Sequence, residues 1–199
     1  MSAGDIRYAV KVGRWEPDAR GRLSVAAMEL YTERGFEQTT VAEIAERAGL
    51  AERTFFRHFS DKREVLFSGA DVLQELLVNA VAEAPQAASP IEVIAEAFAV
   101  AGRVLQERRD FARQRQNVIA ANPELQEREL IKLASLAAAM AGALRLRGVN
   151  DQSAALAAEV GVAAFKIGFE RWVKEPRSGD LPSDIRESLE ELKAVANGR

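Results

Sequence analysis

The sequence has no cysteine and a single histidine, His58. Without cysteine there can be no disulfide, thiolate metal site or cysteine nucleophile, and one histidine cannot form a histidine-rich metal site. The chain also shows no nucleophile paired with a base and no phosphate-cradling glycine loop. We therefore expect no catalytic residues, no metal and no cofactor. A helical enzyme is kept as an alternative that turnover assays would test.

Long uncharged apolar runs are missing too. The first residues, MSAGDIRYAV, lack the apolar core of a signal peptide, and no stretch approaches the ~20 uncharged apolar residues that span a bilayer. We therefore expect a cytoplasmic protein that does not enter a membrane. The net charge of −3 is too small to indicate nucleic-acid binding by itself, so any such contact requires a local concentration of basic residues.

Apolar residues make up 48% of the 199 residues and recur at helical spacing rather than in alternation. This pattern predicts an all-α protein with a substantial core. Short helices precede the segment APQAASP at 84–90, and longer ones follow it. We place a helix-turn-helix head with an N-terminal arm at 1–66, and a larger helical domain for effector binding and dimerisation at 67–199. The predicted helices span about 17–35, 40–49, 52–59, 60–82, 90–105, 122–147, 152–173 and 184–196.

Helix ends carry recognisable local signals. Thr40-Val41-Ala42-Glu43 and Ser89-Pro90-Ile91-Glu92 each read as a capping box, in which a hydroxyl and a carboxylate satisfy the first amides of a helix. Gly35, Gly49 and Gly148 read as helix stops. The second and third helices are therefore short and separated by a tight corner.

That corner, Ala48-Gly49-Leu50-Ala51, lets two short helices cross steeply if Gly49 adopts a left-handed conformation. Apolar residues would then pack inward, and the outward side chains would be Glu52, Arg53, Thr54, Arg57 and His58. Five basic residues against two acidic ones lie between Arg47 and Arg63. An exposed short helix with such side chains suits a DNA major groove, while a plain helical hairpin inside a bundle is the alternative.

The stretch TTVAEIAERAGLAERTFFRHFSDKREVL resembles the DNA-binding domain of the TetR family of regulators, over about Arg20 to Leu66. The family pattern joins a threonine-capped helix, alanine-glycine at the turn, and a third helix that ends in aromatic, histidine and phenylalanine before a lysine. The resemblance implies that Thr40 holds a phosphate, that Glu52, Arg53 and Thr54 lie over base edges, and that Phe56, His58 and Lys62 touch the DNA backbone. The planar fork of Arg53 also matches the two major-groove acceptors of guanine.

Two positions depart from the family pattern. Ala51 stands where serine often caps the recognition helix, so the usual side-chain cap is absent. Phe56 replaces a common tyrosine and leaves only apolar or sugar contact. The basic residues of the N-terminal arm could enter a minor groove or form a solvated tail, and both readings stay open: Arg7, Lys11, Arg14, Arg20 and Arg22.

The long helix at 152–173 carries a stripe of small residues where another helix could approach closely. Its other faces are also apolar, with Leu156, Val160 and Ile167 on one side and Phe165, Phe169 and Trp172 on another. We therefore expect a homodimer built as a twofold four-helix interface, with a buried central helix of a monomer as the alternative. The candidate interface residues are Ala157, Gly161, Ala164, Gly168, Trp172, Ile185, Leu189 and Leu192.

Apolar residues of the middle helices could line an effector cavity, although such spacing is more often typical of a core. The candidates are Phe98, Phe111, Val118, Ile119, Leu133 and Met140, with Arg115 either pairing an acidic ligand or lying in solvent. The stretch RRDFARQRQNVIAANPELQEREL, with RGVND and ERW, resembles regulators related to the mycofactocin regulator, whose ligands are acyl-coenzyme A compounds. That resemblance implies an acyl or other hydrophobic effector, with unrelated aromatic or drug-like compounds as alternatives.

These observations together predict a sequence-specific DNA-binding regulator, by family default a repressor, that a small molecule releases from a palindromic operator. Movement of the helices in the C-terminal domain would tilt the fourth helix and change the separation of the two heads. The rival reading is a helix-turn-helix DNA-binding protein with no small-molecule effector.

Overall fold

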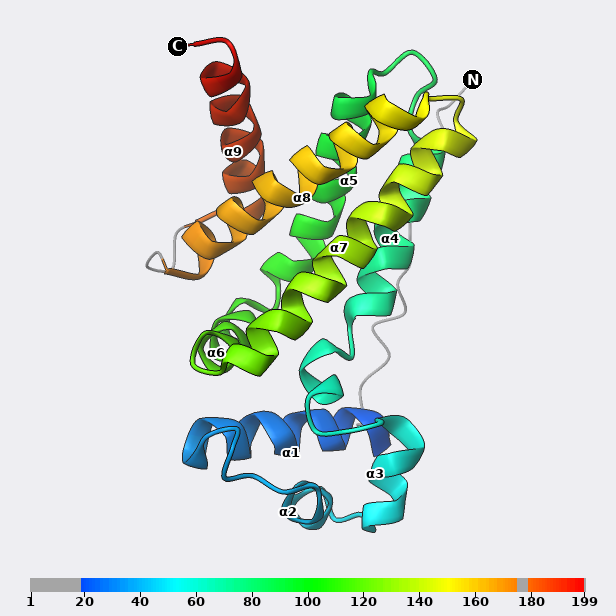
Figure 1. The fold of residues 1–199 in the computed structure, drawn as a ribbon. Helices are drawn as coiled ribbons and strands as arrows, with labels where there is room; N and C mark the ends of the chain where they lie inside the picture. The colour runs from blue at the N-terminus through cyan, green and yellow to red at the C-terminus, as the bar shows by residue number, and fades with distance from the viewer. Residues whose placement is uncertain (1–18, 175–178, 199) are drawn as a thin grey trace, which may run out of the picture. The chain divides into compact units, whose positions relative to one another are not determined.

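The computed structural model describes residues 19–174 and 179–198, and within these ranges it contains α-helices, one short 3-10 helix and no strand. The predicted all-α fold is therefore confirmed. The elements are α1 (Ala19–Arg34), α2 (Val41–Arg47), α3 (Glu52–His58), η1 (Glu64–Phe67), α4 (Ala70–Glu83), α5 (Pro90–Gln106), α6 (Arg109–Ala120), α7 (Pro123–Leu146), α8 (Asp151–Lys174) and α9 (Leu181–Ala196) (Figure 1). The chain divides into two compact units, one ending at Val65 and one beginning at Leu66.

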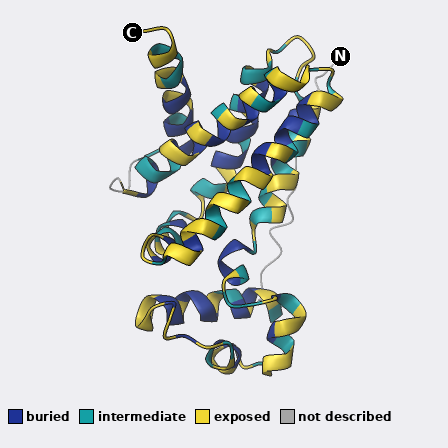
Figure 2. Ribbon diagram, viewed as in Figure 1, coloured by how far each residue is buried: buried dark blue, intermediate teal, exposed yellow. Residues whose placement is uncertain are grey.

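The first unit is a three-helix head built on α1. Leu23, Leu30 and Tyr31 of α1 are buried, and Ile44 of α2 and Phe55 of α3 are fully buried in the same unit. α1 packs against both α2 and α3, which in turn pack against each other. The inward face of each short helix is therefore occupied by the core of the head, and the opposite face is left to solvent (Figure 2).

The second unit is a bundle in which α8 packs against α5, α7 and α9, while α4 packs against α5 and α7. Its core draws on every helix from α4 to α9 and includes Leu77, Phe98, Met140 and Trp172. The ring of Phe98 stacks on that of Phe165 with centroids 5.1 Å apart, which joins α5 to α8 at the centre of the bundle.

The fourth predicted helix, which was expected to run unbroken from Ser60 to about Ala82, is wrong in its first part. The carboxylate of Asp61 accepts hydrogen bonds from the amides of Arg63 (2.8 Å) and Glu64 (3.2 Å), so the chain makes a turn there. The 3-10 helix η1 follows, and α4 begins only at Ala70, after Gly69.

Two further boundaries differ from the prediction. α6 is a separate helix, because the chain leaves helical geometry at Arg108 (φ −120°, ψ 29°), a break that no glycine or proline marks. α9 begins three residues before the predicted Asp184, because the side chain of Asp180 accepts a hydrogen bond from the amide of Ser183 and Pro182 occupies the first turn.

One stretch of the described chain, Glu64–Glu83, is long and apolar enough to cross a membrane by length and composition alone. The core helices of soluble proteins share this length and composition. Here Leu77 and Val81 from this stretch are fully buried in the core of the second unit.

Candidate nucleic-acid interface

The corner between α2 and α3 is formed as the sequence predicts. Gly49 adopts φ +66°, and the amides of Gly49 and Leu50 donate to the carbonyls of Glu46 (2.9 Å) and Ala45 (2.8 Å). These two bonds close the end of α2 in a Schellman motif, which requires a residue that tolerates positive φ. The left-handed conformation predicted for Gly49 is confirmed, and it turns the chain sharply into α3.

α3 has one buried edge and one exposed edge. Phe55 and Phe59 are buried at 0% and 4% exposure, and their ring centroids lie 5.4 Å apart. Glu52, Arg53 and Arg57 are exposed on the other side, as is Phe56, whose exposed fraction is 54%. The spacing of Phe55 and Phe59, one helical turn apart, is what anchors α3 and orients its polar edge outward.

The start of α2 carries the predicted capping box. The amide of Glu43 donates to the hydroxyl of Thr40 (3.3 Å), while the Glu43 carboxylate accepts from the Thr40 amide (2.9 Å) and hydroxyl (2.9 Å). Those hydrogen bonds, the one from the backbone amide first, hold the pKa of Glu43 below its ordinary value. Thr40 is exposed at the positive end of this helix, so its predicted phosphate contact remains sterically open.

Lys62 has a position inside the head that sequence reasoning did not anticipate. Its ammonium donates to the carbonyls of Phe36 (2.8 Å), Thr39 (3.0 Å) and Glu37 (3.3 Å), and it lies 4.3 Å from the centroid of the Phe36 ring. The hydroxyl of Tyr31 donates to the Lys62 carbonyl at 2.6 Å. Lys62 therefore joins the end of α1 to the segment after α3. Its predicted phosphate contact is untested.

His58 and Thr54 lie on the partly buried edges of α3 rather than on its exposed face. The Nε2 atom of His58 is buried and has no hydrogen-bond partner within the described residues. His58 is therefore partly buried, although the sequence predicted an outward side chain, and its implied contact with the DNA backbone stays a prediction.

Three arginines of the head are paired with acids. Arg47 of α2 forms a two-bond ion pair with Glu33 of α1 (3.0 and 2.9 Å) and reaches Glu29 at 3.3 Å. The hydrogen bond from Arg47 holds the pKa of Glu33 below its ordinary value. Arg34 pairs with Glu43 at 2.9 Å and Arg63 with Asp61 at 2.9 Å. Among residues 19–65, the arginines without a hydrogen bond, ion pair or ring contact are Arg22, Arg53 and Arg57.

Of the N-terminal arm, only Arg20 and Arg22 fall within the described residues. Arg7, Lys11 and Arg14 lie outside them. The guanidinium of Arg20 lies 5.6 Å from the centroid of the Phe59 ring, so the start of α1 is close to the end of α3.

The candidate effector residues do not form one group. Phe98 and Met140 are buried in the same core, and Leu133 packs against it. Ile119 is fully buried but lies outside that core cluster, as does Phe111, whose ring has the Arg108 guanidinium 5.1 Å away.

Arg115 is mostly buried, so the solvated alternative considered for it is wrong, and its pairing with an acidic ligand stays a prediction. Its guanidinium donates to the Leu66 carbonyl (2.7 Å) and to Glu129 (3.0 Å), and it lies 5.0 Å from the centroid of the Phe67 ring. Burial lowers the pKa of Arg115, opposed by the charge of Glu129. Arg115 thus ties the first residues of the second unit to α6 and α7.

The small-residue stripe of α8 is covered by helices of its own chain. A side chain at Gly161 would lie 2.1 Å from the Ile94 side chain, and one at Gly168 would lie 2.9 Å from the backbone of Asp184. The stripe therefore lets α5 and α9 approach α8 within the bundle. Seven of the eight predicted interface residues are buried there: Ala157, Gly161, Ala164, Gly168, Trp172, Ile185 and Leu189, whereas Leu192 is half-buried.

A different apolar face of α8 stays open. Leu156 and Ile167 are 59% and 56% exposed, although they are large and apolar. Leu156 also lines a shallow groove between α8, α9 and the start of α5, whose residues are Pro90, Ile91, Ser153, Leu156, Ala157, Val160, Leu189, Leu192 and Lys193.

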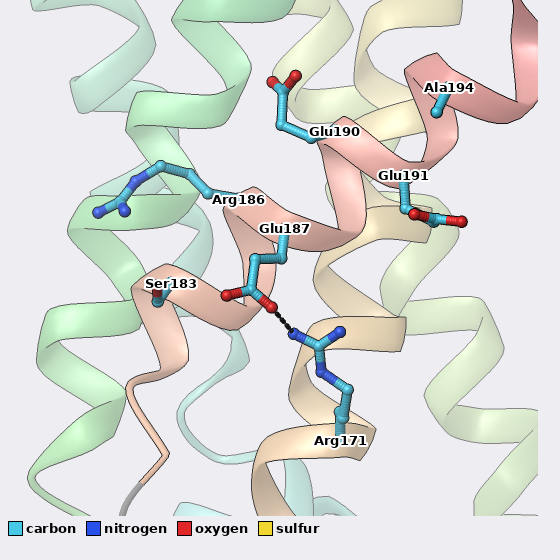
Figure 3. A pocket seen from close by; sticks show the side chains of 7 residues that line it. All are labelled: Arg171, Ser183, Arg186, Glu187, Glu190, Glu191 and Ala194. Atoms are coloured by element: carbon cyan, nitrogen blue, oxygen red, sulfur yellow. Dashed lines mark hydrogen bonds and ion pairs between the residues drawn. The ribbon is translucent and has the colours of Figure 1, made fainter. Parts of the chain in front are cut away.

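A second groove, lined by residues of α8 and α9, is highly charged (Figure 3). Within it Arg171 of α8 pairs with Glu187 (2.6 Å), and also with Asp184 (2.9 Å) at its margin. The remaining lining residues are Ser183, Arg186, Glu190, Glu191 and Ala194. This groove has the wrong chemistry for a hydrophobic effector.

Each of the two units matches a known protein family. Residues 23–68 match the family described as "Bacterial regulatory proteins, tetR family", and residues 88–197 match the "MftR C-terminal domain". The HTH-type transcriptional regulator TcmR of Streptomyces glaucescens is 40% identical over 86 residues, which are 43% of this chain and 38% of TcmR. The matched segment is thus well under half of that relative.

Solved structures with this fold include two regulators named FadR. FadR of Bacillus subtilis, in complex with stearoyl-CoA, aligns over 86% of this chain and 96% of its own at 22% identity, with a TM-score of 0.61. FadR of Thermus thermophilus, a repressor in complex with lauroyl-CoA, aligns over 87% and 93% at 27% identity, with a TM-score of 0.52. With its head and more than half of its length matched by the two family patterns, the chain belongs to the tetR family of bacterial regulatory proteins and carries an MftR-type C-terminal domain.

Proposed function

We propose that this protein is a homodimeric transcriptional repressor, which binds a palindromic DNA operator through α3 and is released from it by a small-molecule effector. The observation that carries the proposal is the exposed edge of α3. It keeps Arg53 and Arg57 unpaired in a head whose other described arginines and lysine make contacts within the protein, Arg22 excepted. Unpaired guanidinium groups on a short, well-anchored helix suit the acceptors of a major groove.

The direct test is selection of bound duplexes from a random pool with the purified protein. We expect enrichment of a palindrome whose half-sites are centred about one DNA turn, or a multiple of it, apart. Arg53→Ala should weaken binding to the selected duplex and relax the preference at one position of each half-site. Arg103→Ala, which removes the same charge from the second unit, serves as the control. Binding with no preference for any duplex over random competitor would contradict the proposal.

The dimer is supported by the open apolar face of α8 and the groove beside it, both defined above. An isolated protein rarely leaves several large apolar side chains on one helix face in solvent, and Leu156 and Ile167 lie about three turns apart on the same face of α8. A second copy of the chain, related by a twofold axis, would cover this face and present two heads to a palindrome. Burial of Gly161 and Gly168 within the chain moves the proposed contact from the small-residue stripe to this face.

We propose an acyl-type molecule as the effector. Two considerations support this class: the MftR-type C-terminal domain, and the complexes of the two FadR proteins with stearoyl-CoA and lauroyl-CoA. Lauroyl-CoA and stearoyl-CoA are therefore the probes, with free coenzyme A as the control. We expect an acyl-CoA, and not coenzyme A, to weaken operator binding by about 5- to 150-fold at fixed salt. Acyl-CoA binding that leaves operator affinity unchanged would contradict release by this ligand.

A DNA-binding protein without an effector is the second candidate, and one observation favours it. Phe98 and Met140, both proposed to line an effector cavity, are 1% and 0% exposed, and Phe98 is stacked on Phe165. An effector would have to open this core, since protein interiors are close-packed. If calorimetry shows no binding of lauroyl-CoA or stearoyl-CoA while the protein still recognises its operator, the second candidate is supported and release by an acyl ligand is excluded.

A further inference from the structure

The exposed edge of α3 carries more than the one arginine that the family resemblance places over bases. Arg53 and Arg57 are both exposed and lie one helical turn apart, with Phe56 between them on the same edge. More than half of the Phe56 side chain, 54%, is in solvent. Two cations and one aromatic ring thus form a continuous outward surface on a helix of seven residues.

This arrangement is unfavourable for the isolated head. Like charges four residues apart destabilise a helix, and α3 has no side-chain cap because Ala51 has no side-chain acceptor. Acidic residues of the head form ion pairs with Arg34, Arg47 and Arg63, yet none pairs with Arg57. The two guanidinium groups are therefore left available for a partner rich in hydrogen-bond acceptors.

The position of Phe56 distinguishes between two kinds of acceptor on that partner. The Phe56 ring meets the Phe55 ring on its inner side, with centroids 5.5 Å apart, and a row of phosphates would meet the arginines but give the exposed part of the Phe56 ring no apolar contact. The floor of a major groove offers both chemistries, since guanine presents two acceptors to an arginine fork and thymine presents a methyl group.

We propose that Arg57 is a second base-reading residue, which binds a guanine about two base-pair steps from the one bound by Arg53 while Phe56 contacts a thymine methyl between them. This inference rests on the proposed DNA-binding function. Four helical residues advance about 6 Å along the axis, and base pairs are spaced about 3.4 Å apart. With α3 lying along the groove, each half-site then holds two guanines about two base-pair steps apart, with a thymine on one strand between them.

Selection from a random duplex pool with the wild type, Arg53→Ala and Arg57→Ala tests the proposal. The wild type should enrich both guanines in each half-site. Arg57→Ala should lose the preference at one guanine and keep the other, and Arg53→Ala should do the reverse. Arg103→Ala should behave as the wild type. Circular dichroism should show wild-type helix content for all variants, since each altered side chain is exposed.

A double-mutant cycle, which combines Arg57→Ala with replacement of the guanine that Arg57 is proposed to bind, then isolates the contact between Arg57 and that base. On the selected operator, Arg57→Ala should bind about 5- to 150-fold more weakly than the wild type. On an operator with that guanine replaced, the two proteins should bind almost equally. An equal loss on both duplexes, with the slope of log affinity against log salt reduced by about 0.9, would assign Arg57 to a phosphate and overturn the inference. Unchanged affinity would overturn it too.

These outcomes separate the inference from the function on which it rests. If the wild type selects a palindrome and Arg57→Ala keeps the preference at every position of it, the role of Arg57 is refuted and the repressor proposal stands. A wild type that selects no palindrome refutes both.

Discussion

The ammonium of Lys62 shows how one side chain can hold a small head together. It meets three carbonyls that follow the end of α1, at Phe36, Glu37 and Thr39. Carbonyls in such a turn have no helical partner and need donors from elsewhere. A lysine supplies three N–H donors at once, which makes it suited to this position.

We expect Lys62→Met to lower the free energy of unfolding by about 2 to 3 kcal/mol, because it keeps the apolar stem but removes a charged donor from partly buried carbonyls. Denaturant unfolding of the free protein measures this loss. Arg53→Met, an exposed change in the same unit, should have little effect on stability. The implied phosphate contact is tested in the same samples, since it predicts that the salt slope of DNA binding falls by about one in the lysine variant.

At the scale of elements, helix starts depend on local carboxylates. Glu43 caps α2 from its third position, and Glu92 accepts hydrogen bonds from the Ser89 amide (2.8 Å) and hydroxyl (2.7 Å) at the start of α5. In both cases these hydrogen bonds hold the pKa of the glutamate below its ordinary value of 4.5. A carboxyl with a lowered pKa in the folded state stabilises that state above the ordinary value, and the contribution is lost as the pH falls through the lowered pKa.

Because the pKa of Glu43 is lowered in the folded state, the stabilisation by Glu43 should decrease as the pH falls. The wild type should exceed Glu43→Gln in thermal stability near pH 6, and the difference should shrink at a pH well below 4.5, as the carboxyl becomes protonated and resembles an amide. Thermal unfolding followed by circular dichroism at the two pH values checks this. Glu46→Gln, on the same helix, should show no such difference, because no hydrogen bond to the Glu46 side chain is present within residues 19–174 and 179–198. A constant difference at both pH values would contradict the prediction.

The close approach of α8 and α9 depends on Gly168. A methyl group there would lie 2.9 Å from the backbone of Asp184 and from the Cα of Ile185, and a helix backbone cannot yield as a flexible side chain can. We expect Gly168→Ala to destabilise the protein by about 1 to 3 kcal/mol through overpacking. Gly142→Ala on α7 is the matched control, because nothing lies within 4 Å of the added methyl. It should stabilise the helix by about 0.5 to 1 kcal/mol.

At the scale of the whole molecule, the open face of α8 determines assembly in our proposal. A single chain leaves Leu156 and Ile167 mostly exposed, although its own core is well packed. Reading a palindrome requires two heads held in a fixed relation, so the dimer contact and operator recognition should fail together.

The double substitution Leu156→Glu and Ile167→Glu should therefore yield monomers and greatly weaken binding to the palindrome, while helix content stays at the wild-type level. Light scattering after size-exclusion chromatography gives the mass. Leu146→Glu, the control, places one glutamate at a 91% exposed leucine at the end of α7 and should remain dimeric. A dimer that persists in the double variant would place the contact elsewhere.

Local chemistry made much of the fold and part of the site predictable. Thr40 and Glu43 indicate the start of α2, and Gly49 indicates its end. The spacing of Phe55 and Phe59 indicates which edge of α3 is buried. These signals act between residues a few positions apart, so they can be read without knowing the rest of the fold.

Contacts between distant residues decided the remainder. Lys62 binds carbonyls 23 to 26 positions away, and Arg115 binds one 49 positions away, so their side chains looked free in the sequence. Gly161 and Gly168 permit close helix packing in any direction, and only the folded bundle assigns them to α5 and α9 rather than to a second chain. A pattern of residue types indicates that a close contact or an ion pair is possible. Which two groups form that contact is decided by the tertiary structure, because it brings together residues that are far apart in the sequence.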